Sequence, residues 1–119
     1  MTGPTKHGDV TVFELEREYD ALDVARFEPF AAELLTAAKS INPPLLVLDF
    51  GHTAYIGSSF IETLVRAWKR LKERGGRMAL CGVGGFCQDV LRATRLDSLW
   101  PICDDRDAAI TLLQEPAAS

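Results

Sequence analysis

Cysteine is scarce in this sequence, which excludes two kinds of small protein. The 119 residues hold only three cysteines, Cys81, Cys87 and Cys103, and no two of them form a Cys-x-x-Cys pair. An odd number without paired spacing predicts neither a disulfide framework nor a zinc site. We therefore expect three reduced thiols that pack inside the protein, and no metal.

The sequence also lacks an excess of positive charge and any long apolar run. Thirteen Lys and Arg face 17 Asp and Glu, which leaves a net charge of -4. This balance gives no electrostatic reason to expect a phosphate backbone or an anionic membrane as partner. No stretch approaches the ~20 apolar residues of a membrane span, and residues 1–10 lack the regions of a signal peptide. We predict a cytoplasmic protein that binds neither nucleic acid nor membrane.

What remains is an ordinary globular composition. Hydrophobic residues make up 47% and charged residues 25% of a chain whose length suits one domain. Residues 1–8 are polar and carry glycine and proline, so we expect a flexible N-terminus, a domain over residues 9–114 and a flexible C-terminus over 115–119.

The first half of the chain predicts strand, helix and strand. Alternating apolar residues indicate a strand from Val10 to about Asp20. Apolar residues at helical spacing follow, with Pro29 expected in the first turn because proline is tolerated there. Asn42-Pro43-Pro44 ends this helix. Residues 45–48 are all apolar, which is typical of a central strand covered on both faces.

The second half continues the alternation. A helix from Ser58-Ser59 ends at Gly75-Gly76, where glycine takes up the left-handed capping conformation. We expect Trp68 in the core on its inner face. The later elements are a strand at 78–81, a helix with Phe86, Val90, Leu91 and Thr94 on one side, an edge strand at 100–103 and a last helix capped within 104–107.

This alternation predicts an α/β fold. Its expected core is a mixed, mostly parallel sheet of four to five strands with about four helices packed on it. The chain shows no internal repeat.

The residues richest in possible chemistry lie at the start of the second long helix. In open α/β sheets, sites collect outside the carboxyl ends of strands, and the free N–H groups of a helix start favour negative charge. A phosphoryl group on Ser58 or Ser59 would be held well there. Ser59 with Glu62 three residues later also fits a capping box, which needs no function. From these residues alone, the cap is the favoured interpretation.

Other motifs predict no activity. Residues 49–51 spell the kinase tripeptide Asp-Phe-Gly, but the other kinase motifs are missing. The run Gly82-Val83-Gly84-Gly85 lacks the third glycine at the spacing that a dinucleotide loop needs. His52 has no acid spaced to orient it as a base. We therefore expect no catalytic residues and no cofactor.

Four segments together resemble one family. They are residues 45–50, the run Ile56-Gly57-Ser58-Ser59, residues 71–80 and residues 96–102. In combination they closely resemble the STAS domain of anti-sigma factor antagonists and of the cytoplasmic tails of sulfate transporters. The resemblance runs from about Val10 to Leu113 and implies the α/β fold described above.

The resemblance also implies a site. The family's helix start reads Asp-Ser-Ser-Gly, and a partner that is both serine kinase and anti-sigma factor phosphorylates the second serine, which is Ser59 here. Gly57 replaces the family's Asp, and Phe60 replaces its Gly. The family's Glu-Leu-Asp falls on residues 18–20. The partner-binding residues that the resemblance implies are Asp20, Gly57, Ser58, Ser59, Phe60 and Glu62.

Two functional hypotheses follow. The first is an antagonist-like switch that docks on a kinase-type anti-sigma factor and is regulated at Ser59, or less favourably at Ser58. The second is a scaffold or sensor without phosphotransfer, which binds other STAS proteins or a small ligand. For Phe60 we expect an exposed aromatic anchor, with packing beside Phe50 or Tyr55 as a nearly equal alternative.

Overall fold

Five strands form one mixed sheet in the computed structural model, which describes residues 5–14, 24–51 and 58–114. The sheet follows the order of the chain. The first two strands pair antiparallel and the other three pairs are parallel, which confirms the predicted fold class. The strands are β1 (Thr5–His7), β2 (Val10–Glu14), β3 (Leu45–Asp49), β4 (Arg77–Cys81) and β5 (Ile102–Cys103).

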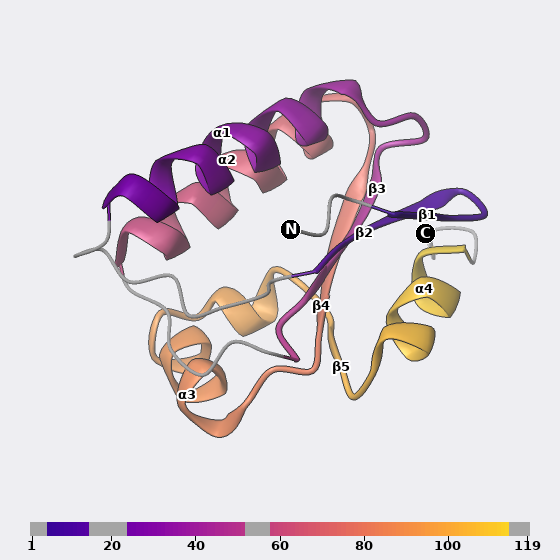
Figure 1. Ribbon diagram of the computed structural model, residues 1–119. Helices are drawn as coiled ribbons and strands as arrows, with labels where there is room; N and C mark the ends of the chain where they lie inside the picture. The colour runs from indigo at the N-terminus through magenta and orange to yellow at the C-terminus, as the bar shows by residue number, and fades with distance from the viewer. Residues whose placement is uncertain (1–4, 15–23, 52–57, 115–119) are drawn as a thin grey trace.

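The helices cover both faces of this sheet (Figure 1). Three of them lie on one face and the last lies on the other. A short 3-10 turn, Leu96–Ser98, precedes β5. The helices are α1 (Val24–Ser40), α2 (Ser58–Glu73), α3 (Gly85–Ala93) and α4 (Arg106–Gln114).

The central strand β3 is buried on both sides, as its apolar run predicts. Leu46 and Leu48 belong to the larger core beneath α1, α2 and α3, whereas Val47 belongs to a second core beneath α4. All three side chains are fully buried. Successive strand residues point to opposite faces, so an unbroken apolar run is what a doubly covered strand requires.

The Gly75-Gly76 turn ends α2 as expected, and each glycine has its own reason. Gly75 has a φ of +75°, the left-handed region that glycine adopts without strain. The amide of Gly76 donates to the carbonyl of Leu71 at 2.7 Å and closes the helix end. A Cβ on Gly76 would lie 2.1 Å from the carbonyl oxygen of Pro44, so this backbone approach admits no side chain.

The boundaries of the first two elements differ from the sequence expectation. Thr5–His7, assigned to a flexible terminus, pair with Val10–Val12 as an edge strand, because the turn at Gly8, with a φ of +64°, folds the chain back. Helix α1 begins at Val24, so Pro29 is its sixth residue instead of lying in its first turn. Residues 15–20 of the predicted first strand lie outside the described residues.

The buried side of α3 also differs from the expectation. Cys87 and Leu91 are fully buried and Val90 is partly buried, but Phe86 is 51% exposed and Thr94 is exposed. The real stripe therefore begins one residue later, at Cys87. The expected inward packing of Cys87 is confirmed.

Candidate functional site at the serine end of the sheet

The two serines lie in the first turn of α2, at the edge where the parallel strands end. Ser58 is the first helical residue, and Ser59 lies inside the turn instead of at the N-cap position that a capping box requires. No acidic residue lies in this first turn. The positive end of the helix dipole is therefore not offset by a carboxylate of the same turn, and it favours an added negative group. Glu62, one turn on, is exposed.

Two of the predicted partner-binding residues, Asp20 and Gly57, lie outside the described residues, as does His52. The structure therefore places only part of the predicted set. The helical backbone of Ser58 and Ser59 and the side chains of Phe60 and Glu62 are what it describes.

Phe60 is a packing residue, so its expected exposure is wrong. Its side chain is 1% exposed and packs edge-on against Phe50, with 5.9 Å between the ring centroids. The alternative of packing beside Phe50 is thereby confirmed. The helical phase explains the result: Phe60 lies four residues before Leu64 and so shares the stripe that faces the core. The family's glycine at this position is replaced by a residue that ties the helix to the end of β3.

A large exposed aromatic does occur near this edge, at Phe86. Helices α2 and α3 each follow one of two neighbouring parallel strands, β3 and β4, so both begin outside the carboxyl ends of those strands. Phe86 and Leu99 are the exposed large hydrophobic residues of the described ranges. The helical period of 86, 90, 91 and 94 had suggested burial of Phe86, and only the packing of α3 reveals its exposure.

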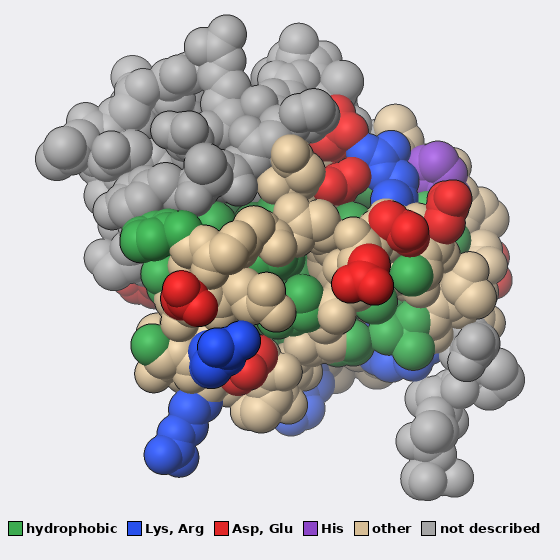
Figure 2. Space-filling view, turned by 90° about the horizontal axis from the view of Figure 1, so that it is seen from below, with side chains coloured by type: hydrophobic (Ala, Val, Ile, Leu, Met, Phe, Trp, Pro, Cys, Tyr) green, Lys and Arg blue, Asp and Glu red, His purple; other side chains and the backbone are tan. Residues whose placement is uncertain are grey.

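An ion cluster at the same edge was missed by sequence reasoning. Arg106, the first residue of α4, donates to Oδ2 of Asp49 from Nε at 3.0 Å and from Nη2 at 2.8 Å. Its Nη2 also donates to the carboxylate of Glu14. Glu14 and Asp49 are register partners at the ends of β2 and β3. Arg106 lies 57 positions after Asp49 and 92 positions after Glu14, so no local sequence pattern links it to either residue. Acidic side chains gather on this side of the molecule (Figure 2).

The cluster has a clear electrostatic character. The hydrogen bond to Asp49 is the main cause that raises the pKa of Arg106, and the bond to Glu14 adds to it. The side chains of Arg106, Glu14 and Asp49 are 32%, 28% and 15% exposed, so the charges are only partly screened by solvent. The guanidinium therefore stays charged and binds the two carboxylates together.

None of the three cysteines is bonded to another; Cys81 and Cys87 are buried, as expected, and Cys103 is only partly buried. Burial raises the pKa of the Cys81 thiol to about 12, and the nearby Asp49 adds to the rise. Burial likewise raises the pKa of Cys87 and Cys103. A thiol is a poorer nucleophile when its thiolate form is disfavoured, and the buried Cys81 and Cys87 act as packing groups of the two cores.

The family can now be assigned from comparison with known proteins. The family model described as the STAS domain matches residues 4–109. This chain belongs to the STAS domain family. No curated protein matches the sequence.

Solved structures support the same family. This chain resembles an anti-sigma-factor antagonist (STAS) domain protein from Planctomyces limnophilus. The TM-score is 0.82, and the two are 32% identical over 94% of this chain and 97% of that one. A putative anti-sigma factor antagonist from Thermotoga maritima has a TM-score of 0.81 at 20% identity, covering 94% and 93%. The antagonist SpoIIAA in its unphosphorylated form has a TM-score of 0.67 at 18% identity, covering 94% and 96%. The last two likenesses show the fold.

Trp68 lies at the margin of the STAS domain core. It is partly buried and packs against the larger core, with its ring centroid 6.3 Å from that of the fully buried Trp100. The ammonium group of Lys72 lies 4.9 Å from the Trp68 ring centroid. The inward orientation is as predicted, but burial is incomplete, because the outer side of the ring borders a groove of about 410 Å³ lined by Trp68, Lys69, Lys72 and Glu73.

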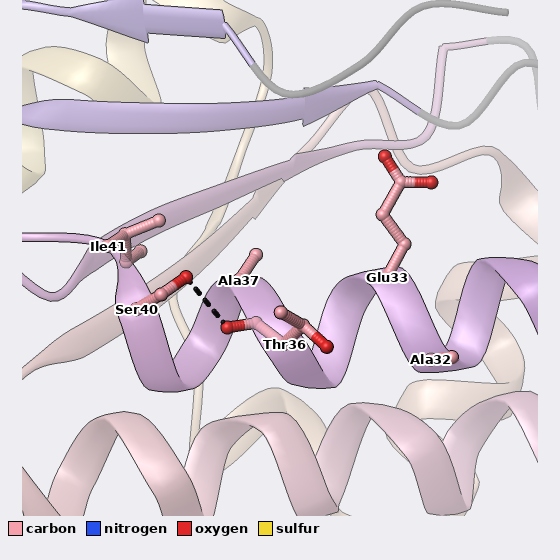
Figure 3. A pocket seen from close by; sticks show the side chains of 6 residues that line it. All are labelled: Ala32, Glu33, Thr36, Ala37, Ser40 and Ile41. Atoms are coloured by element: carbon pink, nitrogen blue, oxygen red, sulfur yellow. Dashed lines mark hydrogen bonds between the residues drawn. The ribbon is translucent and has the colours of Figure 1, made fainter.

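Another groove follows α1 (Figure 3). It measures about 380 Å³ and includes none of the predicted site residues. The hydroxyl of Ser40 donates to the carbonyl of Thr36 at 2.8 Å, so this polar group on its wall is already paired. The groove lining is Ala32, Glu33, Thr36, Ala37, Ser40 and Ile41.

Two further classes of feature are missing from the described ranges. Within residues 5–14, 24–51 and 58–114, no group of three His, Cys, Asp or Glu side chains is placed to hold a metal ion. No helix of those same ranges is long and apolar enough to cross a membrane.

Proposed function

We propose that this STAS domain is a protein-binding switch of the anti-sigma factor antagonist kind. It docks on a kinase-type anti-sigma factor through the serine end of its sheet and is regulated by phosphorylation of Ser59. The observation that carries the proposal is the start of α2: two serines in a first turn without an acidic residue. The anti-sigma factor antagonists among the structural neighbours support the same class of partner.

Phosphorylation would act on docking and leave the fold unchanged. A phosphoryl group adds about 1.5 to 2 negative charges, which the positive end of the helix dipole tolerates. A partner surface that fits an uncharged serine would meet repulsion and a desolvation penalty. The switch therefore belongs to the interface.

Phe86 completes the proposed docking surface. Its helix follows β4, the strand that neighbours β3, at the carboxyl edge of the sheet, and its side chain is half exposed. Aromatic residues supply much of the binding energy when a partner desolvates them. In this proposal Phe86 takes the role of aromatic anchor that the sequence had suggested for Phe60.

The proposal is tested by phosphate transfer. Purified protein is incubated with Mg²⁺, ATP and each kinase-type anti-sigma factor encoded in the same genome, and any phosphate is located by mass spectrometry. We expect Ser59→Ala to abolish labelling, whereas Ser58→Ala keeps most of it. Full labelling of Ser59→Ala would refute the assignment to Ser59.

A negative result would favour the second hypothesis. If the wild-type protein is neither phosphorylated nor bound by any such kinase, the domain is a STAS scaffold or sensor without phosphotransfer. In both cases we propose a binding module without enzymatic activity of its own.

A further inference from the structure

The ion cluster at the carboxyl edge holds the tight turn of residues 49–51 in place. Oδ2 of Asp49 is taken by Arg106, and Oδ1 accepts the amide of Gly51 at 2.8 Å. The amide of Phe50 donates to the carbonyl of Cys81 at 2.8 Å. Hydrogen bonds thus link the turn to Arg106 of α4 and to Cys81 of β4. A third hydrogen bond, from the amide of Gly51 to the Asp49 carboxylate, lies within the turn.

Gly82 lies against one side of this turn. Gly82 has a φ of +64°, and a Cβ on it would lie 3.1 Å from Oδ1 of Asp49 and 3.2 Å from the amide nitrogen of Gly51. A side chain at residue 82 would therefore press on both members of the hydrogen bond. The backbone after β4 is shaped so that the Asp49 carboxylate can stay in this position.

The same turn contacts α2, the helix that carries the serines. Phe50 lies between Asp49 and Gly51, and its buried ring packs edge-on against Phe60 at 5.9 Å. Phe60 directly follows Ser59 in α2. A continuous set of described contacts thus runs from Arg106, on the α4 face of the sheet, to the first turn of α2 on the opposite face.

We propose that Arg106 is a positioning residue for the serine-bearing start of α2. By binding Asp49, it fixes the turn at Phe50, and through the two phenylalanine rings it fixes the helix turn that presents Ser59. The effect of Arg106 on partner recognition rests on the function proposed above. Without the guanidinium, the carboxylates of Glu14 and Asp49 would repel each other across neighbouring strand ends, and Asp49 would no longer be held against Gly51.

The chain offers a matched control for testing this role. Arg106→Gln removes one positive charge from the cluster. Arg92→Gln removes the same charge from α3, where Arg92 forms only an exposed pair with Asp89 at 3.9 Å. Arg106→Lys keeps the charge but loses the two-pronged geometry of the guanidinium. It also serves if Arg106→Gln fails to fold.

Amide hydrogen exchange measures the position of the turn and of the helix start. The amide of Gly51 donates to Asp49, and that of Glu62 donates to the carbonyl of Ser58 in a helix that begins there. We expect Arg106→Gln to speed exchange at both about tenfold, with Arg106→Lys between it and the wild type, and little change at Val47 and Ala79 in the sheet. Equal exchange in Arg106→Gln and Arg92→Gln, or an equal rise at Val47 and Ala79, would overturn the proposal.

Phosphate transfer gives a second measurement. With a kinase that labels Ser59, Arg106→Gln should lower kcat/KM for transfer about tenfold, whereas Arg92→Gln leaves it unchanged. An unchanged kcat/KM in Arg106→Gln would overturn the proposed consequence for recognition. If no kinase labels the wild-type protein, the proposed function fails, and the exchange experiment still decides the role of Arg106.

Discussion

Replacing Phe60 with glycine, the residue that the family has at this position, should destabilise the protein severely. The Phe60 ring is 1% exposed and packs on Phe50, so its removal costs the burial of a whole aromatic side chain. Phe-to-Ala changes in cores cost about 3 to 5 kcal/mol. Glycine in a helix adds about 1 kcal/mol relative to alanine. The expected loss for Phe60→Gly is therefore roughly 4 to 6 kcal/mol.

This loss is large beside the whole stability of such a domain, about 5 to 15 kcal/mol. Urea unfolding followed by tryptophan fluorescence measures it, because Trp68 and Trp100 report on the same core. Phe60→Ala separates the ring from the backbone effect and should lose about 1 kcal/mol less. Phe60→Leu, which keeps most of the volume, should lose less than about 1.5 kcal/mol. If Phe60→Gly unfolds at the wild-type urea concentration but binds the partner weakly, Phe60 belongs to the interface and the packing argument is wrong.

Three further predictions concern other residues. Trp68→Ala should cost about 2 to 3 kcal/mol, less than a fully buried tryptophan, because one side of the ring already faces a groove; a loss under about 1 kcal/mol in urea unfolding would contradict its contact with Trp100. Phe86→Ser should weaken binding of the anti-sigma partner at least tenfold in calorimetry with little change in Tm, whereas Leu99→Ser, at the other exposed hydrophobic position, should leave affinity unchanged; equal affinities would remove Phe86 from the surface. Because the pKa of Cys81 is raised from 9.0 to about 12, the folded state keeps its thiol protonated while the unfolded chain loses the proton. Stability should therefore fall by about 1.4 kcal/mol per pH unit between those values, and urea midpoints measured up to pH 10 should fall less steeply in Cys81→Ala; identical slopes would refute the shift.

Much of the fold was predictable because it depends on local pattern. The apolar run at 45–48 indicated a doubly covered strand, and the structure buries it on both faces. The pair Gly75-Gly76 indicated the end of a helix because glycine adopts the left-handed conformation that ends one, and Gly75 has this conformation. Asp105 caps α4 by accepting the amide of Ala108 at 2.8 Å, within the capping segment expected from the sequence. Such signals involve residues a few positions apart, so the sequence displays them directly.

The candidate site was predictable only in part. The serine pair at a helix start was visible in the sequence, and the family resemblance pointed to the same residues. The orientation of single side chains was less visible: Phe60 is buried and Phe86 exposed, the reverse of the expectation. The spacing from Phe60 to Leu64 did carry the phase of Phe60, whereas the packing of α3 against the core decides which way Phe86 faces.

By itself, the sequence determined the class of elements, their order, the STAS family and the position of the serines, because periodicity, turn residues and motifs are local properties. Only the tertiary structure decided that Glu14, Asp49 and Arg106 meet at one edge and that Phe50 ties this edge to Phe60. The physical reason is sheet register: parallel pairing brings the ends of separate strands together, and contacts between residues far apart in sequence form only when the strands align.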